Sequence, residues 1–144
     1  MAYIKIGSYY NYGKLKNFAW SLLIIGGIIY LFYRPHGILL FQITDFLGLT
    51  SYIDIFKHDS FLLSLPDFVI FSLPAGLWTA SYLLLMFANT TFLSRKNRLL
   101  ISLPLPVSAI LLEFLQLFGW CPGIFDIYDL ACYTIPIIIF IKNV

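Results

Sequence analysis

Residues 17–33 read NFAWSLLIIGGIIYLFY, an uncharged run of seventeen residues between Lys16 and Arg34. At about 1.5 Å of rise per residue, this length is close to the minimum for a helix that crosses about 30 Å of hydrocarbon. Lys16 and Arg34 can extend the span, because their long side chains reach back from apolar surroundings to water. The run therefore predicts a transmembrane helix.

Three further apolar runs follow. Residues 68–93 include Pro74, where we expect a kink, and residues 99–118 include Pro104 and Pro106 in their first two turns, where we expect an irregular start. The fourth run covers residues 126–141. The sequence therefore predicts an all-α membrane protein in which residues 1–144 form a single membrane-embedded domain. Its four transmembrane helices are expected at about 17–33, 68–93, 99–118 and 126–141.

The composition agrees with residence in lipid. Of the 144 residues, 60% are hydrophobic and 11% are charged, whereas soluble domains average about 25% charged residues. Nucleic acid is not expected as a partner, because the net charge is only +2 and the basic residues form no patch interleaved with aromatics. Membrane lipid is the expected partner. Gly26 and Gly27 are expected to pack closely against Gly76 where the first two spans meet.

The basic residues predict the orientation. Seven of the nine Lys and Arg residues fall on one side of the four predicted spans, and Arg34 and Lys57 fall on the other. The basic side of a membrane protein faces the cytoplasm, so both termini are expected there. All seven acidic residues then lie in the outer half of the molecule. The seven basic residues of the inner side are Lys5, Lys14, Lys16, Arg95, Lys96, Arg98 and Lys142.

Residues 34–67 form a long external connection. Within it, residues 38–48 alternate apolar and polar side chains with helical spacing, which predicts a short amphipathic helix that lies flat on the membrane surface or caps the helix bundle. Thr50 and Ser51, followed by Asp54, are expected to start another short turn. His36 and His58 also lie in this connection, but without the spacing of metal ligands.

Four polar side chains form the most informative pattern in the chain. Glu113 and Gln116 are three residues apart near the end of the third span, and Asp126 and Asp129 have the same spacing at the start of the fourth. Residues three apart share a face of a helix. A tight turn is expected to bring the two pairs together near the outer membrane surface. The turn residues are Gly119, Pro122 and Gly123.

Three interpretations of these four residues are open. The two aspartates could stabilise the start of the last helix, with Glu113 and Gln116 as a hydrogen-bonded latch between helices. The cluster could instead bind a ligand or a lipid headgroup. It could also be a catalytic carboxylate site, because an acid in an apolar helix is costly and often functional. No nucleophile, nucleotide-binding or metal-ligand motif accompanies it, so we expect no metal and no cofactor and rank catalysis below binding.

The pattern Glu113-x-x-Gln116, then Gly123 and Asp126-x-x-Asp129, resembles the VanZ-like family of small membrane proteins, which is named for a teicoplanin-resistance protein. The resemblance covers about residues 99–140 and the four-helix layout. This chain departs from the family pattern at Ile124, where the family has arginine, at Tyr133, where it has asparagine, and at Pro136, near a later glycine. Without the arginine, the acidic cluster lacks its natural counter-ion.

The resemblance implies a multi-pass protein of the bacterial inner membrane that acts at the cell envelope, in antibiotic resistance. We therefore expect it to bind a lipid or glycopeptide-type ligand at the outer leaflet. The alternatives are an intramembrane enzyme that uses an acidic pair on a lipid-linked substrate, and a structural or regulatory membrane protein. A lipid-linked envelope precursor and another membrane protein are the further partners expected.

Overall fold

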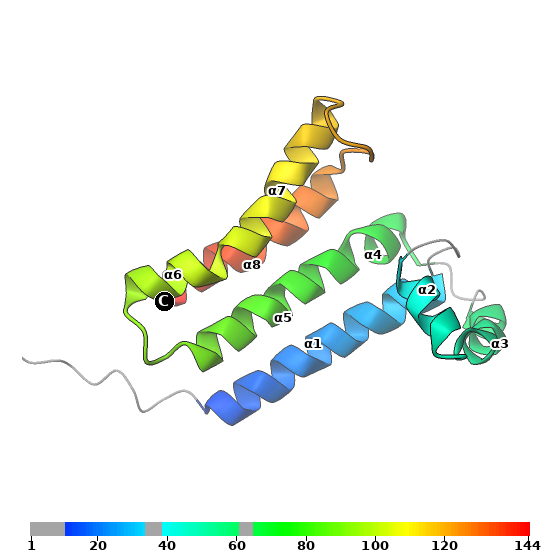
Figure 1. Cartoon of the computed structure of the whole chain (residues 1–144), viewed down its shortest axis with the longest axis horizontal. Helices are drawn as coiled ribbons and strands as arrows, with labels where there is room; N and C mark the ends of the chain where they lie inside the picture. The colour runs from blue at the N-terminus through cyan, green and yellow to red at the C-terminus, as the bar shows by residue number, and fades with distance from the viewer. Residues whose placement is uncertain (1–10, 34–38, 61–64) are drawn as a thin grey trace, which may run out of the picture.

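The computed structural model describes residues 11–33, 39–60 and 65–144, and all regular structure in these ranges is helical (Figure 1). The prediction of an all-α fold is confirmed. Lys5, Arg34 and His36 lie outside the described residues, as do the side chains of Lys57 and His58. The helices are α1 (Tyr12–Tyr33), α2 (Leu39–Phe46), α3 (Thr50–Ser60), α4 (Asp67–Phe71), α5 (Leu73–Asn89), α6 (Arg95–Ser102), α7 (Pro104–Leu117) and α8 (Ile127–Asn143).

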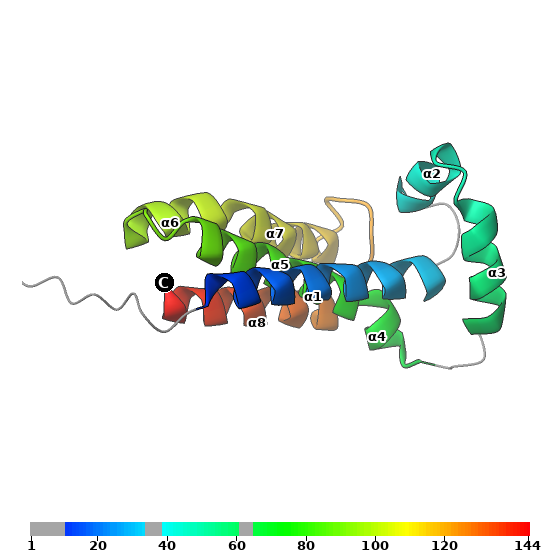
Figure 2. The same cartoon turned by 90° about the horizontal axis from the view of Figure 1, so that it is seen from below.

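The long helices lie side by side in the order α1, α5, α8, α7, so that α5 is sandwiched between α1 and α8. Both views place the C-terminus, α6 and the start of α1 at one end, and α2, α3 and the α7–α8 turn toward the other (Figures 1 and 2). The buried apolar core is small and lies between α5 and α8. It consists of Leu83, Phe87, Ile137 and Phe140.

The contact between α1 and α5 depends on small residues and two hydrogen bonds. A Cβ atom on Gly26 would lie 2.7 Å from Nε1 of Trp78. That Nε1 donates to the carbonyl of Leu23 at 3.2 Å, and the buried Ser81 hydroxyl donates to the carbonyl of Ala19 at 2.7 Å. Such close approach through small and hydroxylated residues is the usual way in which helices associate in lipid.

The predicted contact of Gly76 with the first span is wrong. A Cβ atom on Gly76 would lie 2.9 Å from Cβ of Cys132, so this glycine faces α8, whereas Gly27 has no atom within 4 Å of an added Cβ. The reason is the position of α5 between two helices: it presents Trp78 and Ser81 to α1 and Gly76 to α8. Only Gly26 of the predicted glycine pair is at a close-packing point.

Prolines break two of the predicted spans. Residues 68–93 form α4 and α5, separated at Ser72, because Pro74 has no N–H for the helix hydrogen bond. Residues 99–118 begin earlier than predicted, at Arg95, because Ser94 caps α6 by accepting from the N–H of Asn97 at 3.5 Å. They then bend by 45° between α6 and α7, where Pro104 begins α7.

Three helix ends differ from the predicted bounds, which follow the ends of the apolar runs. α1 starts at Tyr12 rather than at residue 17, because the Asn11 side chain accepts from the N–H of Lys14 at 3.2 Å. α5 ends at Asn89, before the predicted residue 93, and Thr90 closes it. α8 extends to Asn143, two residues past the predicted end.

Where the connection between residues 34 and 67 is described, it contains two helices rather than one helix and a turn. The helix predicted over 38–48 is α2, which Gly48 terminates with a φ of +67°. The turn predicted at Thr50 is an eleven-residue helix, α3, which packs on α1. The Thr50 hydroxyl at the start of α3 donates to Asp45 of α2. Apolar side chains of both helices are exposed, such as Phe46, Tyr52 and Ile55.

Length and composition identify one described helix, α1, as able to cross a membrane, and a second if the bent pair α6–α7 counts as one span. α5 and α8 have 17 residues each, against about 20 for a typical span. Large apolar side chains are nevertheless exposed along the long helices; examples are Ile24, Leu105, Leu111, Ile135 and Ile139.

Candidate functional site

The turn between α7 and α8 begins with a glycine cap. The N–H of Trp120 donates to the carbonyl of Leu115 at 2.9 Å, and the N–H of Gly119 donates to the carbonyl of Gln116 at 3.0 Å. This pair of bonds is a Schellman motif, in which the residue at the position of Gly119 takes a left-handed conformation. Its φ is +70°, and Gly123 has a φ of +135°. The chain therefore reverses at the glycines that the sequence singled out.

Glu113 and Asp126 are hydrogen-bonded across this turn. Glu113 is only 6% exposed, and its Oε2 accepts from the backbone N–H of Asp126 at 3.4 Å. Asp126 is the N-cap of α8: its Oδ1 accepts from the N–H of Tyr128 at 2.8 Å. Its Oδ2 accepts from the Ser72 hydroxyl at 3.4 Å, at the break between α4 and α5. These two carboxyl groups thus connect three segments of the fold.

Gln116 packs against the turn itself. A Cβ atom on Gly123 would lie 2.7 Å from Cδ of Gln116. The glutamine side chain therefore covers the backbone of residue 123, and a glycine there gives it room. Gln116 does not line the cleft described next.

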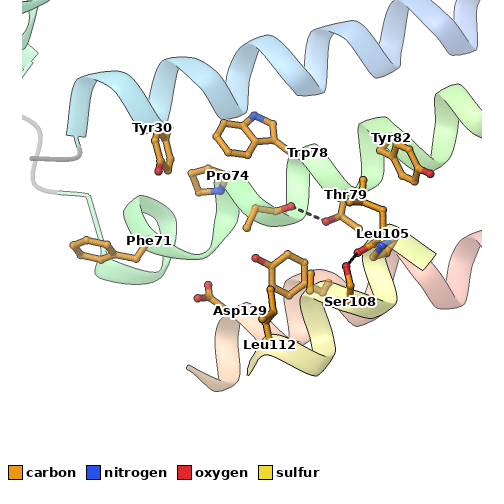
Figure 3. A pocket seen from close by; sticks show the side chains of 14 residues that line it. Tyr30, Phe71, Pro74, Trp78, Thr79, Tyr82, Leu105, Ser108, Leu112 and Asp129 are labelled. Carbon is orange, nitrogen blue, oxygen red and sulfur yellow. Dashed lines mark hydrogen bonds between the residues drawn. The ribbon is translucent and has the colours of Figure 1, made fainter. Parts of the chain in front are cut away.

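A cleft of about 540 Å³ opens between α5 and α7, with α8 as its floor and one residue of α1 at its edge. Figure 3 shows Tyr30 and Trp78 on one side of it, and Leu112 and Asp129 on the other. Of the four residues that the sequence predicted as a site, Asp129 lines this cleft. The remaining lining is Phe71, Pro74, Ala75, Thr79, Tyr82, Leu105, Pro106, Ser108, Ala109 and Tyr133.

The aromatic lining was missed at the sequence level. Tyr30, Trp78, Tyr82 and Tyr133 are spread over three helices, and single aromatics in apolar helices are equally typical of interfacial belts. Tyr133 lies at the position where the VanZ-like pattern has asparagine, and four residues after Asp129. That spacing places both side chains on one face of α8, which was the signal available in the sequence.

The field at this end of the cleft is negative. The charges of Asp126 and Asp129 both act on Glu113, so the three carboxyl groups form one electrostatic cluster. The lining residues include no lysine or arginine. Anionic groups are repelled by such a cluster, whereas amines and hydroxyl groups find carboxylate and phenol oxygens to bind.

The four predicted residues therefore divide into two roles. Glu113, Gln116 and Asp126 hold the α7–α8 turn, and Asp129 lines a cleft. Within the described ranges, no group of three or more His, Cys, Asp or Glu residues is placed to hold a metal ion. Compared with known protein families, with curated proteins and with solved structures, the chain matches none.

Proposed function

We propose that this chain is a multi-pass protein of the bacterial inner membrane that binds an amphiphilic, lipid-type ligand at the outer leaflet. The observation that carries the proposal is the cleft between α5 and α7, where Asp129 lies among Tyr30, Trp78 and Tyr133. Its volume of about 540 Å³ is in the range of small-molecule sites, roughly 300–1,000 Å³.

Four spans are proposed: α1, α4 with α5, α6 with α7, and α8. The many large apolar side chains exposed along the long helices support this arrangement, because lipid would cover them. At the α7–α8 turn, Trp120 is 76% exposed and Ile124 is 89% exposed, as expected of side chains inserted at the interface of a bilayer. Lengths of 17 residues for α5 and α8 fit spans whose ends are completed by α4 and by the turn.

The charges support an orientation with α6 in the cytoplasm. α6 begins with Arg95 and Lys96, and Lys142 is in the last turn of α8; both of these helix ends lie at the end of the molecule that also holds the start of α1 (Figures 1 and 2). α4 begins with Asp67 and α8 begins after Asp126, and both of these helix starts lie toward the opposite end. The positive-inside rule then places the acidic end of the cleft at the outer leaflet.

The lining favours a headgroup that carries an amine or several hydroxyl groups. Tryptophan and tyrosine faces attract cations, and the Asp129 carboxylate accepts hydrogen bonds from ammonium or hydroxyl donors. Toward Tyr82 and Leu105, the hydroxyl groups of Thr79 and Ser108 donate to backbone carbonyls of their own helices, so this part of the cleft suits the beginning of a hydrocarbon tail (Figure 3). This combination fits a lipid-linked envelope precursor or a glycopeptide-type ligand, as expected of a VanZ-like protein that acts in antibiotic resistance.

Binding is favoured over catalysis by the contacts of the other carboxyl groups. Glu113 and Asp126 are engaged with the backbone of the turn and with Ser72. Acid–base chemistry needs two groups that reach the same substrate, and of these acids only Asp129 lines the cleft. The hydrogen bonds of Glu113 and Asp126 favour a structural role for that pair.

Asp129→Asn is expected to weaken binding of an amine amphiphile about tenfold, which is ~1.4 kcal/mol for one charge-assisted hydrogen bond. The probe is a fatty amine with a brominated tail, added to the protein in phosphatidylcholine nanodiscs. Quenching of Trp78 fluorescence reports binding, in a Trp20→Phe, Trp120→Phe background that leaves Trp78 as the reporter. The same measurement on the unsubstituted Asp129 protein gives the reference.

Glu113→Gln is the matched control, because it makes the same carboxyl-to-amide change outside the cleft lining. It is expected to shift the quenching curve much less than Asp129→Asn does, because Glu113 belongs to the negative cluster but does not line the cleft. The binding proposal fails if Asp129→Asn quenches like the reference, or if both variants lose the same affinity.

Cysteine labelling in intact cells is expected to reach position 52 and not position 97. Both residues are exposed in the structure, but they lie on opposite sides of the membrane in the proposed orientation. The variants are Tyr52→Cys and Asn97→Cys in a background of Cys121→Ser and Cys132→Ala, with a membrane-impermeant maleimide. Labelling of position 97 before lysis, with position 52 protected, would reverse the orientation.

A further inference from the structure

The bend between α6 and α7 creates a groove that is separate from the α5–α7 cleft. Its volume is about 440 Å³, and it lies along the elbow where Leu103 links the two helices. The bend of 45° turns the start of α7 away from α6. The lining consists of Lys96, Leu99, Leu100, Leu103, Pro104 and Val107.

The structure gives different contacts to the three basic residues of α6. Arg98 donates from Nη2 to the carbonyl of Phe87 at 2.8 Å and lies over the Phe87 ring, with Cζ 4.6 Å from the ring centroid. Arg95 donates from Nη2 to the carbonyl of Ile141 at 3.4 Å. Both arginines therefore join α6 to its neighbours. Lys96 is exposed and lines the groove.

Two of the groove's apolar side chains pack on the core, and two others are exposed on its open side. Leu99 and Leu103 pack against the buried cluster of α5 and α8. Leu100 is 69% exposed and Val107 is 39% exposed. An open apolar groove of this kind, lined near the start of α6 by the side chain of Lys96, is complementary to a hydrocarbon chain that ends in a negative charge.

We propose that this groove binds an anionic phospholipid of the cytoplasmic leaflet, with an acyl chain along the leucines and its phosphate at Lys96. Inorganic phosphate would leave the leucines uncovered, and a zwitterionic lipid would bring a positive group toward Lys96. The site lies at the basic end of the molecule and shares no lining residue with the α5–α7 cleft. It depends on residence in the membrane but not on the ligand of the cleft.

The test measures how lipids raise the thermal unfolding temperature of the purified full chain in neutral detergent micelles. Phosphatidylglycerol is expected to stabilise the protein at lower concentration than phosphatidylcholine, because a ligand that binds only the folded state raises its stability. Lys96→Gln should weaken the apparent affinity for phosphatidylglycerol about fivefold, the effect of one basic residue at an anionic surface. Lys142→Gln, which removes a charge at the same end but outside the groove, should not.

Val107→Trp tests the apolar part of the groove. The larger side chain is expected to fill the groove from its open wall and to abolish the phosphatidylglycerol effect, while the unfolding temperature without lipid stays within a few degrees. Equal losses in Lys96→Gln and Lys142→Gln would mean diffuse attraction and overturn the site. Full stabilisation by inorganic phosphate, or by phosphatidylglycerol in Val107→Trp, would overturn its assignment to a lipid.

Discussion

Replacing Gly76 by leucine is expected to lower the free energy of unfolding by about 3 kcal/mol or more, which is the upper range for overpacking a tight contact. Even a single added carbon would lie 2.9 Å from Cβ of Cys132 and 3.3 Å from its carbonyl oxygen. Two of the atoms in the way belong to or adjoin the backbone of α8. They cannot rotate aside, so α5 and α8 must separate and uncover the core around Phe87 and Phe140.

Gly27→Leu is the control for this experiment. It makes the same change in α1, where no atom lies within 4 Å of an added Cβ, so it should leave stability unchanged or raise it slightly through helix propensity. Unfolding in mixed micelles with increasing denaturing detergent measures both variants. Equal stability of the two variants would show that α5 and α8 are not packed closely at Gly76.

Replacing Asp126 by alanine is expected to destabilise the protein by about 2 kcal/mol. The substitution removes the N-cap of α8, which is worth about 0.5–2 kcal/mol, and it removes the acceptor of the Ser72 hydroxyl. The negative charge at the first turn of α8 is lost as well, where it is favoured by the helix dipole. Thermal unfolding in detergent reads out the change.

Asp126→Asn separates the cap from a ligand-binding role. Asparagine caps a helix about as well as aspartate, so this variant should retain most of the stability that Asp126→Ala loses. It should also bind the brominated amine almost as the reference does, because Asp126 does not line the cleft. If Asp126→Asn has normal stability but no longer binds the amine, Asp126 contributes to ligand binding.

The polar site illustrates why spacing alone was insufficient. Residues three apart share a face only if both are helical, and Asp126 precedes α8 with φ −129° and ψ 124°. Its side chain turns back to the N–H of Tyr128, while Asp129 in the first helical turn faces the cleft. Glu113 and Gln116 do lie in one helix, yet Glu113 reaches the backbone of Asp126 and Gln116 covers Gly123.

The sequence by itself determined the helical class, the four apolar regions, and the turn at Gly119 and Gly123. Those features depend on local chemistry: the length of apolar runs, the missing N–H of proline, and the freedom of glycine at positive φ. Tertiary structure decided which helices touch and what lies between them. The stretch 17–33 lies within α1 and packs on α5; of its two glycines, Gly26 is at this contact and Gly27 is not. The cleft arises from the order of the helices, which depends on contacts between residues distant in the chain, whereas the groove at Leu103 follows from the local bend at which Pro104 begins α7.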